Sequence, residues 1–491
     1  MSCPIALARS TVARRLQLLT ATIAIAVAGC AAGPDYHRPD IRPLTTDSYA
    51  AAGSDLTSAA AQDRWWTLLQ DPVLDELVEL ALRQNPDLAG AEAMVRRARE
   101  GVRMAHASLL PAVNAAARVS DDKLSRNGEN LALIPFTPKT TEFTDYRVGF
   151  DASWELDLAG RTRREAEAAV ARFGSAAETR NDARVVVAAE VAGAYIDFCL
   201  AFQRLAVARS RLSSIGEILR LVDLQRMAGV AGDEERNRVD ADRQGAAAAV
   251  AALEAMADAS TFSLAALTAE TPEQLRTRLV LARGVPATPA VVPVGLPSDL
   301  LRRRPDVRRA ERELAAATAD VGSAVAAQFP RLSLIGDFGL DSVRLGDLTG
   351  AASRYWNLAP QLAIPLFAGG RLRSQVRAAE ATSDAALASY RATVIRAVAD
   401  AESCIVRYAA ARSRTGLLSS AAAALQANAG FERVRYQAGD LSMIEVLTAE
   451  RTSEDAAEQR LIAAADLGRS YVALNKALGG GWQREDRQNG L

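Results

Sequence analysis

Few side chains in this sequence could carry out catalysis or hold a metal ion. The 491 residues include only two histidines, His37 and His106, and these lie far apart in the chain. Zinc spacings, phosphate-binding glycine loops, dinucleotide fingerprints and nucleophile elbows are absent from the sequence. The carboxylates mostly alternate with arginines on helical segments, which is typical of a solvated surface. The sequence therefore predicts a protein that is not an enzyme and that uses neither a cofactor nor a metal ion.

Cys30 is the residue whose surroundings indicate covalent chemistry. Residues 16–28 are apolar, three arginines precede them, and the cysteine ends the motif VAGC. Residues 1–29 have the layout of a secretory signal, because their apolar part is too short for a spanning helix. The motif is similar to the bacterial lipobox, in which the cysteine becomes the acylated first residue, carrying chains such as palmitate. Because Ala31 follows instead of aspartate, the motif favours sorting to the outer membrane.

The other cysteines show no pattern of redox chemistry. Cys3 is removed with the signal, whereas Cys199 and Cys404 remain in an oxidising compartment. Both lie in helical, apolar surroundings, which favours two buried free thiols over a disulfide. Their spacing alone does not exclude a disulfide.

The chain consists of two copies of one plan. Pro86 and Pro305 are 219 positions apart, and Gly160 and Gly370 are 210 positions apart. The offset changes once, by nine residues, which indicates a longer loop in the first copy. The expected segments are a signal at 1–29, a lipidated arm at 30–62, a first repeat at 63–270, a connector at 271–297, a second repeat at 298–478 and a disordered tail at 479–491.

Each copy contains a hairpin whose strands alternate between apolar and polar residues. In the second copy Leu332, Leu334 and Phe338 alternate with Ser333 and Asp337. Alternation over about ten residues, with aromatic residues near the ends, is the signature of a transmembrane β-strand. A half-buried strand of a soluble sheet gives the same alternation. The strands are expected at about 112–121, 145–156, 331–341 and 355–366.

Each hairpin is followed by a long stretch without proline that is expected to be helical. Residues 161–227 and 371–437 comprise 67 positions each, which corresponds to about 100 Å of helix. Apolar residues of the second stretch step alternately by three and four, at Leu387, Tyr390, Val394, Ala397, Ala401, Cys404 and Tyr408. This heptad seam implies supercoiled helices, and a plain coiled-coil rod would share it. The charge content of both stretches excludes that either spans a bilayer as a helix.

Each long helix is expected to turn at a glycine and return as a second helix. The turns contain Gly229 and Gly439, and the returning helices are expected at about 233–268 and 442–477. Each copy would therefore end in a helix–turn–helix tip.

Composition and strand number restrict the architecture further. Lysine and arginine total 58 against 59 acidic residues, so no basic surface indicates nucleic acid. Aromatic residues make up 5%, and abundant alanine suits long packed helices better than a sandwich or a doubly wound sheet. Four membrane strands cannot close a barrel, and each unpaired backbone group in lipid costs several kcal/mol. The chain is therefore expected to oligomerise.

Several stretches carry a resemblance to a known family. They are CAAGPDYHRP, RWWTLLQDPVLDELVELAL, SWELDLAGR, GLPSDLLRRRPDVRRAERELAAATADVG, FPRLSL, PLFAGGR and RYQAGDLSMIEVL. On these motifs the sequence resembles the outer membrane factors of tripartite efflux systems, and the match covers nearly the whole mature chain. These are the TolC-like channels, and the NodT-type lipoproteins are the subgroup it is most similar to.

The resemblance implies a fold and a function. The fold would be mixed and mainly α, with four strands per chain in a 12-stranded barrel of a homotrimer and a long periplasmic α-helical barrel. The protein would be a passive exit duct in the bacterial outer membrane, conducting small molecules such as drugs out of the periplasm. Its partners would be outer membrane lipid, a periplasmic adaptor (membrane fusion) protein and an inner-membrane pump, usually of the RND type.

The resemblance also implies functional residues at the tips. Family channels close just after the Ala-Gly turn, which places the gate on Ile444, Thr448 and Arg451. Thr448 replaces a common aspartate, so Glu445 or Asp440 would supply any acidic charge there. Ile444 would form an apolar constriction, which can gate by dewetting. Candidate contacts for the adaptor are Arg226, Gly229, Arg435, Tyr436 and Gly439.

Two alternatives stay open. A duct for type I protein secretion or metal-ion efflux would share the architecture, although no methionine or histidine cluster favours metal export. A lipid-anchored structural coiled-coil protein would share the helices but would lack membrane strands. In such a system the pump, and not the duct, would select the exported compounds.

Overall fold

A computed structural model describes residues 31–40, 48–49, 56–59, 61–125, 141–441 and 443–482, the side chain of Ile444 excepted. The signal segment and Cys30 lie outside the described residues. The chain divides into two units, each described by itself below. The described parts of Met1–Arg38, Arg96–Gly174 and Glu311–Ala388 form the sheet unit, and those of Pro39–Val95, Ser175–Ala310 and Ser389–Leu491 form the helical unit.

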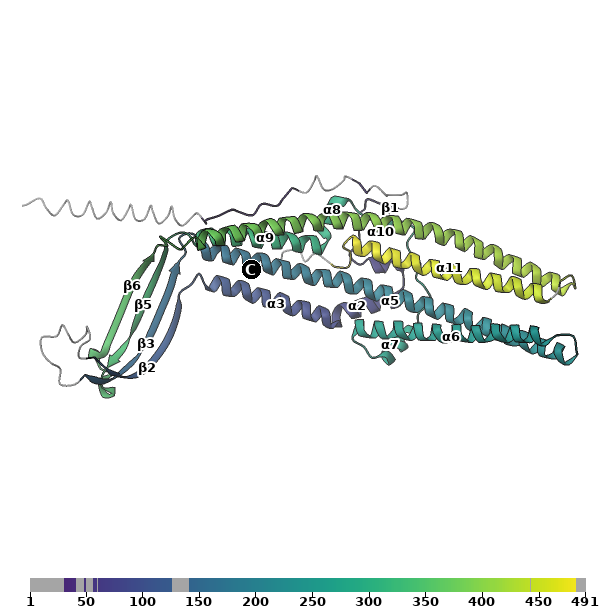
Figure 1. The fold of residues 1–491 in the computed structure, drawn as a ribbon, viewed down its shortest axis with the longest axis horizontal. Coiled ribbons are helices and arrows are strands. Elements are labelled where there is room, and N and C mark those ends of the chain that lie inside the picture. Colours follow the sequence, from purple (N-terminus) through teal and green to yellow (C-terminus); the bar gives the residue numbers. More distant parts are fainter. Residues whose placement is uncertain are drawn as a thin grey trace, which may run out of the picture. The chain divides into compact units, whose positions relative to one another are not determined.

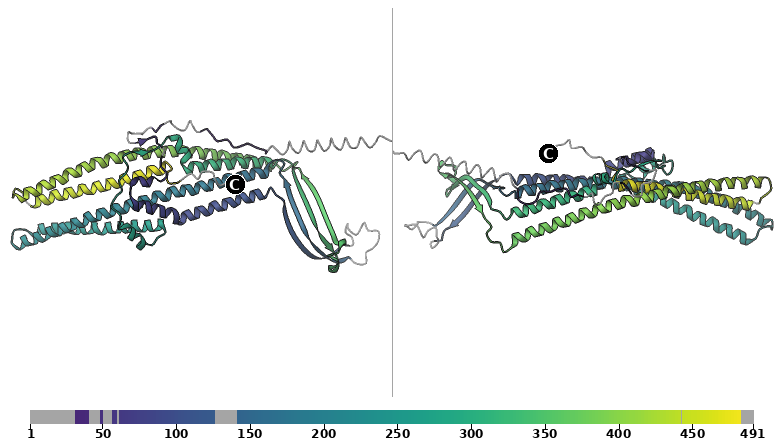
Figure 2. Two further views of the ribbon diagram at one scale, coloured as in Figure 1. Left: turned by 180° about the vertical axis from the view of Figure 1, so that it is seen from behind. Right: turned by 90° about the horizontal axis from the view of Figure 1, so that it is seen from above.

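The sheet unit contains one antiparallel sheet of two hairpins (Figure 1). Its strands are β2 (Ala112–Lys123), β3 (Glu142–Leu156), β5 (Arg331–Ser342) and β6 (Arg354–Ala363). They lie in the order β2-β3-β5-β6, so the hairpins of the two sequence repeats join through β3 and β5. Strand β6 ends three residues before the expected position 366. The left-hand view of Figure 2 shows these strands side by side from behind.

Two related helices lead into the hairpins. They are α3 (Pro86–Ala107) before β2 and α9 (Pro305–Ala326) before β5, and each starts at a proline. Proline suits the first turn because its missing N–H would have no intrahelical partner there. At α3 the side chain of Asn85 caps the helix by accepting from the backbone N–H groups of Asp87 and Leu88, at 2.9 and 3.2 Å.

Long helices follow the hairpins and return at glycine turns. They are α5 (Arg161–Met227), α6 (Asp233–Thr268), α10 (Arg371–Gln437) and α11 (Met443–Ala477). Gly229 and Gly439 have φ angles of 70° and 85°, a left-handed conformation that favours glycine at a helix end. In α10 the apolar heptad residues from Tyr390 to Tyr408 are buried, as coiled-coil packing requires.

One argument from the sequence is wrong for α5. That helix contains an 18-residue window of mean hydropathy 1.9 with few charges, so charge content alone does not exclude a membrane span. A stretch of α6 is likewise long and apolar enough to cross a membrane, by length and composition alone. In α5, however, 67% of the window is buried inside the protein. The apolar residues of α5 are used for packing against its neighbours, which explains its hydropathy.

The helical unit also contains a belt of short elements. They are β1 (Leu56–Thr57), η2 (Trp65–Leu69), α2 (Pro72–Gln84), α7 (Pro272–Leu279), β4 (Val292–Pro293) and α8 (Pro297–Arg303), with β1 and β4 paired in parallel. The connector expected at 271–297 therefore holds a helix besides its short strand. Thr271 and Gln274 begin α7 with reciprocal side chain to backbone bonds of 3.4 and 3.1 Å, a capping box.

The expectation of a disordered tail from position 479 is wrong for Gly479–Trp482. Trp482 is buried, and its Nε1 donates to the carbonyl oxygen of Arg303 at 3.1 Å. The guanidinium of Arg308 lies 4.9 Å from the Trp482 ring centroid. The φ angles of Gly479 and Gly481, 73° and 111°, let the chain turn back onto the belt. The rest of the expected tail, 483–491, lies outside the described residues.

Candidate functional site

The sheet has one apolar face that is open to the surroundings. Directly paired residues lie on the same face of a sheet, and Phe150, Phe338 and Trp356 form one such row. Their side chains are 58, 57 and 77% exposed. Other members of this face are Val113, Val148, Trp154, Leu332, Leu334, Leu358 and Leu362. A continuous apolar face of this kind is suited to contact with lipid or another apolar partner.

The opposite face is polar and internally paired. Arg147 donates from Nε to the hydroxyl of Tyr355 at 2.8 Å, and its guanidinium lies 4.2 Å from the centre of that ring. Arg147 also pairs with Asp337 at 3.4 Å, and Asp337 accepts from Asn357 at 3.3 Å. Asn114 and Asp151 make a further bond on this face. The two faces together meet the requirement for a sheet between lipid and water.

Two facing glycines support this polar cluster. Gly149 and Gly339 are paired across β3 and β5, and Tyr355 is the partner of Gly339 on β6. A Cβ on Gly339 would lie 2.7 Å from the Cα of Gly149 and 2.9 Å from a ring carbon of Tyr355. Glycine is therefore required for the Tyr355 ring to lie flat over the two strands.

The edges of the sheet decide whether it can act alone. Within the described residues, β2 and β6 each pair along one side only. In hydrocarbon, unpaired backbone groups cost several kcal/mol each, and the smallest membrane barrels have about eight strands. A lipid-facing sheet of this size must therefore be completed by strands from other copies of the chain.

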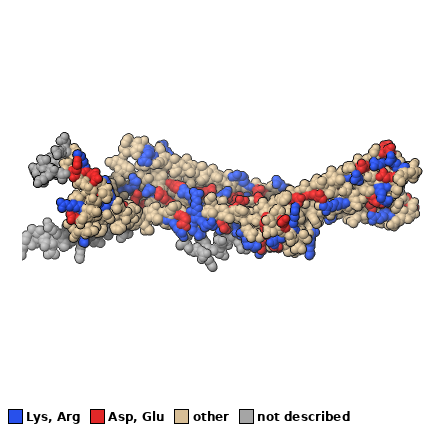
Figure 3. Space-filling model, turned by 90° about the horizontal axis from the view of Figure 1, so that it is seen from below, with Lys and Arg blue, Asp and Glu red and all other residues tan. Residues whose placement is uncertain are grey.

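The expected adaptor contacts lie at the two hairpin tips of the helical unit. Gly439 N–H donates to the Tyr436 carbonyl at 3.0 Å, and Asp440 N–H donates to the Arg435 carbonyl at 2.9 Å. At the other tip, Arg226 pairs with Asp233 at 2.5 Å around the turn at Gly229. The sequence reading missed two strongly exposed apolar tip residues, Met227 and Val230. Figure 3 shows acidic and basic side chains intermixed at the tips.

The expected gate residues lie on the first turns of α11 and in the turn before it. Ile444 is part of the helix, but its side chain is outside the described residues. Asp440, Glu445 and Thr448 are exposed. Arg451 instead points to the first repeat, where its guanidinium lies 3.5 Å from the carboxylate of Asp242 on α6. The structure therefore places Arg451 in a contact between hairpins.

That contact belongs to a longer row of ion pairs, here called the seam, which sequence reasoning missed. The seam joins α11 to α5 and α6 through the pairs Arg469–Asp197 (2.5 Å), Arg204–Glu458 (2.5 Å), Arg211–Asp455 (2.9 Å) and Arg451–Asp242 (3.5 Å). On α5 the members Asp197, Arg204 and Arg211 are seven residues apart, which is the heptad period. This charge spacing was the available signal, but it does not identify the partners.

A cavity of about 430 Å³ lies beside the seam. Its walls include alanines of α6 and the charged residues Arg204, Arg451, Glu454 and Glu458. Burial raises the pKa of the Glu454 carboxyl, which Arg211 only partly offsets. Because of this cavity, α11 packs less tightly against α6 beside the seam than side chains do in a closed core.

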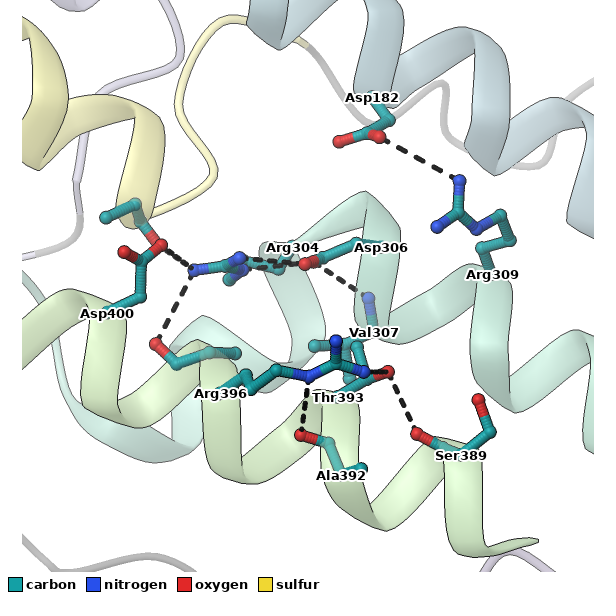
Figure 4. A network of polar contacts seen from close by, with 12 residues as sticks. Asp182, Arg304, Asp306, Val307, Arg309, Ser389, Ala392, Thr393, Arg396 and Asp400 are labelled. Carbon is teal, nitrogen blue, oxygen red and sulfur yellow. Dashed lines mark hydrogen bonds and ion pairs between the residues drawn. The ribbon is translucent and has the colours of Figure 1, made fainter. Parts of the chain in front are cut away.

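The belt fixes the other end of the α10–α11 hairpin through Arg304 (Figure 4). Arg304 donates to Asp306 at 3.0 and 2.7 Å, to Asp400 of α10 at 3.1 Å, and to the Ala477 carbonyl that ends α11 at 3.1 Å. Burial by itself would raise the pKa of Asp306. The hydrogen bonds and the charge of Arg304 outweigh this effect and hold the pKa of Asp306 below its usual value. Arg304 therefore joins the start of α9, the middle of α10 and the end of α11 through its hydrogen bonds.

The two cysteines of the described chain lie in its interior. Cys199 and Cys404 are free and buried, which confirms two buried thiols, and burial raises the pKa of Cys199 to about 12. Such thiols are unreactive at neutral pH. Among the described residues, no group of three or more potential ligands could hold a metal ion.

Comparison with known proteins places these features. The model of the family "Outer membrane efflux protein" matches residues 77–270 and 296–480. Outer membrane protein OprJ of Pseudomonas aeruginosa is 31% identical over 488 residues, covering 94% of this chain and 95% of OprJ. The toluene efflux pump outer membrane protein TtgI of Pseudomonas putida is 31% identical, covering 92% and 96%. Nodulation protein T of Rhizobium leguminosarum is 28% identical, covering 95% and 94%.

A solved structure of an outer-membrane channel is similar to this chain in both sequence and fold. The outer-membrane channel OprN is 34% identical and superimposes with a TM-score of 0.83, covering 93% of this chain and all of OprN. The expected fold, a duplicated and mainly helical chain that supplies four strands to a 12-stranded trimeric barrel, is the fold of these outer membrane channels.

Proposed function

Because the chain belongs to the outer membrane efflux protein family, we propose that it is the exit duct of a tripartite pump whose inner-membrane member is an RND transporter. The protein is an outer membrane efflux channel, and a periplasmic adaptor would connect it to the pump. Its relatives include a pump component named for toluene efflux, which supports export of small apolar molecules.

The observation that carries the proposal is the two-faced sheet with open edges. Three copies would pair β6 of one chain with β2 of the next and so close a barrel. The apolar face with Phe150, Phe338 and Trp356 would meet lipid, and the face with Arg147 and Asp337 would line the water-filled lumen. A structural coiled-coil protein has no use for such a sheet.

The gate of the duct is assigned to the start of α11. Ile444 would narrow the periplasmic entrance, with Thr448, Glu445 and Asp440 near it. Arg451 would act through its ion pair with Asp242, so that opening requires α11 to leave the first repeat along the seam. The exposed tips with Arg226, Gly229, Arg435, Tyr436 and Gly439 would receive the adaptor.

Anchoring is assigned to Cys30. Acylation at this residue would add a lipid anchor to each copy, in line with the lipobox-like VAGC motif. Labelling of cells with an alkyne analogue of palmitate tests it: the wild-type protein should take up label and Cys30→Ser should not. Equal labelling of both would overturn the assignment.

The efflux role is tested by deletion of the gene in a strain without a redundant duct. Susceptibility to a panel of drugs and solvents should rise and should return to normal with the wild-type gene. Unchanged susceptibility to every compound would count against the proposal. Purified protein in planar bilayers should also form conducting pores, whereas a structural rod would give none.

A further inference from the structure

The segment directly after Cys30 is fastened to the sheet unit. Ala32 N–H donates to the carbonyl of Ala159 at 2.9 Å. Two close backbone contacts accompany this bond: a Cβ on Gly33 would lie 2.5 Å from the Cα of Gly322, and a Cβ on Gly160 would lie 2.7 Å from the Cα of Ala31. Residues 31–38, here called the arm, therefore lie against the start of α5 and the end of α9.

A buried arginine holds the arm in place. The side chain of Arg164 on α5 is only 6% exposed. It donates to the carbonyl of Ala32 at 3.2 Å, to the carbonyl of Gly33 at 3.4 Å and to the carboxylate of Asp35 at 2.6 Å. The Arg164 bond lowers the pKa of Asp35, so that the pair stays charged. Charge-assisted bonds of this kind are about twice as strong as neutral ones.

The remainder of the arm follows the same two helices. Tyr36 packs against Ala171 of α5 and against Ala315 and Ala316 of α9. Arg38 then pairs at 2.9 Å with Glu311, whose side chain is 8% exposed. The arm thus occupies a groove between α5 and α9 along its whole length, and its first residue sits at the sheet end of that groove.

The start of the arm determines where the acyl chains of Cys30 begin. Ala31 contacts Gly160, four residues after β3 ends at Leu156. Cys30 directly precedes Ala31 in the sequence, and neighbouring Cα atoms are about 3.8 Å apart, so an acyl chain on Cys30 would start near this end of the sheet. Acyl chains partition into hydrocarbon, hence they must leave this point toward the apolar face of the sheet.

Gly160, which Ala31 contacts, follows β3 in the sequence, and β3 pairs with β5, so the two central strands supply the apolar residues next to this point. Leu156 pairs with Leu332, and Trp154 pairs with Leu334, at the helix-side ends of β3 and β5. These four side chains are only partly covered within the chain. The next row, Ala152 with Gly336, is formed by small residues. The side chain of Leu358 on β6 flanks this row, since one of its methyl carbons lies 3.5 Å from where a Cβ on Gly336 would be.

We propose that this surface, formed by Trp154, Leu156, Leu332, Leu334 and the small residues beyond them, binds the acyl chains of the protein's own Cys30. Arg164 is the positioning residue, because it holds the arm that carries the chains. The inference rests on the proposed acylation of Cys30. It places lipid over the joint between the two repeats and keeps it away from the edges β2 and β6, which must stay free to pair with neighbouring copies.

Photochemical cross-linking tests the proposal on the intact, membrane-embedded protein. Cells are grown with a palmitate analogue that carries a diazirine and an alkyne, the purified protein is irradiated, and its cross-linked peptides are identified by mass spectrometry. We expect cross-links to the peptides of β3 and β5 to exceed those to β2 and β6 several-fold. Equal cross-linking of all four strands, or a preference for an edge strand, would overturn the proposal.

Variants separate the arm from the general stability of the fold. Arg164→Met, and more mildly Asp35→Asn, should release the arm and spread the cross-links evenly over the four strands. Arg172→Met is the control, because Arg172 also joins α5 to α9, through Asp320, from a more exposed position than Arg164. Its cross-link pattern should remain that of the wild type. A pattern that survives in both arm variants would contradict the role of Arg164.

Failure of the acyl-binding proposal can be distinguished from failure of the proposed channel function. If the chains bind elsewhere, the cross-links move while bilayer conductance and drug susceptibility stay normal. A wild-type protein that takes up no probe would overturn acylation, and the acyl-binding surface with it, but not the channel.

Discussion

Removal of one ion pair from the seam should make the channel open more often. Arg204 donates to one carboxylate oxygen of Glu458 from both Nε and Nη2, at 2.8 and 2.5 Å. The side chains are 24 and 29% exposed, between a surface pair and a buried one. A pair of this kind contributes about 1.5 kcal/mol, above the value of exposed pairs and below that of buried ones.

The effect on gating is multiplied by the number of subunits. If opening breaks the pair in each of three copies, its loss removes about 4–5 kcal/mol from the closed state. Every 1.4 kcal/mol is a factor of about ten, so Glu458→Gln should raise the ratio of open to closed channels by roughly a thousandfold. Single-channel recording in planar bilayers measures this ratio directly.

The control is an ion pair that opening leaves intact. Arg209 and Glu254 join α5 to α6 within one hairpin at 2.7 Å, so Glu254→Gln should leave the open probability unchanged. The charge swap Arg204→Glu with Glu458→Arg should restore much of the closed state. The reasoning is refuted if Glu458→Gln opens no more often than the wild type, or if Glu254→Gln opens the channel to the same degree.

Three further perturbations test other parts of the molecule. Ile444→Ala should raise basal conductance in bilayers, and an unaltered closed state would remove Ile444 from the gate. Arg304→Met removes the bonds to Asp306, Asp400 and the Ala477 carbonyl and should cost about 3–5 kcal/mol per chain, which would lower the Tm. Substitution of its exposed neighbour, Arg302→Met, should leave the Tm unchanged. Burial raises the pKa of Glu454 above its usual 4.5. The folded state therefore favours the protonated carboxyl, and the free energy of unfolding falls as the pH rises from about 4.5 through the folded pKa. Glu454→Gln should therefore raise the Tm at neutral pH and lose that advantage below about pH 4.5; a Tm gain that does not depend on pH would contradict this.

The sequence predicted those features that depend on local pattern. The helices α5 and α10 coincide with stretches that contain no proline and are followed by glycine turns, so their bounds follow from backbone chemistry. The strands follow from alternation, and the apolar residues expected to share a face, such as Leu332 and Phe338, do so. The fold class and the efflux function came from the resemblance, since alternation by itself allowed a soluble sheet.

Features that depend on contacts between distant segments could not be predicted. Arg204 and Glu458 are 254 positions apart, and their pairing depends on the axial register of two helices that the sequence does not state. The same holds for Arg451 with Asp242, which turned an expected gate residue toward another hairpin. Trp482 follows three glycines and looks like part of a loose tail, yet its ring is buried by Arg308 and the belt. The helix α7 was within reach, because Thr271 and Gln274 have capping-box spacing.

The joint between β3 and β5 also bears on how the wall of the barrel is assembled. Each chain already contains two hairpins side by side, so every second junction around the cylinder forms by intramolecular collapse at high effective concentration. Closure of the barrel then brings together three chains, each of which loses translational and rotational freedom. Without the joint, six separate hairpins would lose that freedom. Gene duplication thereby lowered the kinetic order of barrel closure, which favours completion at the low copy numbers of a membrane protein.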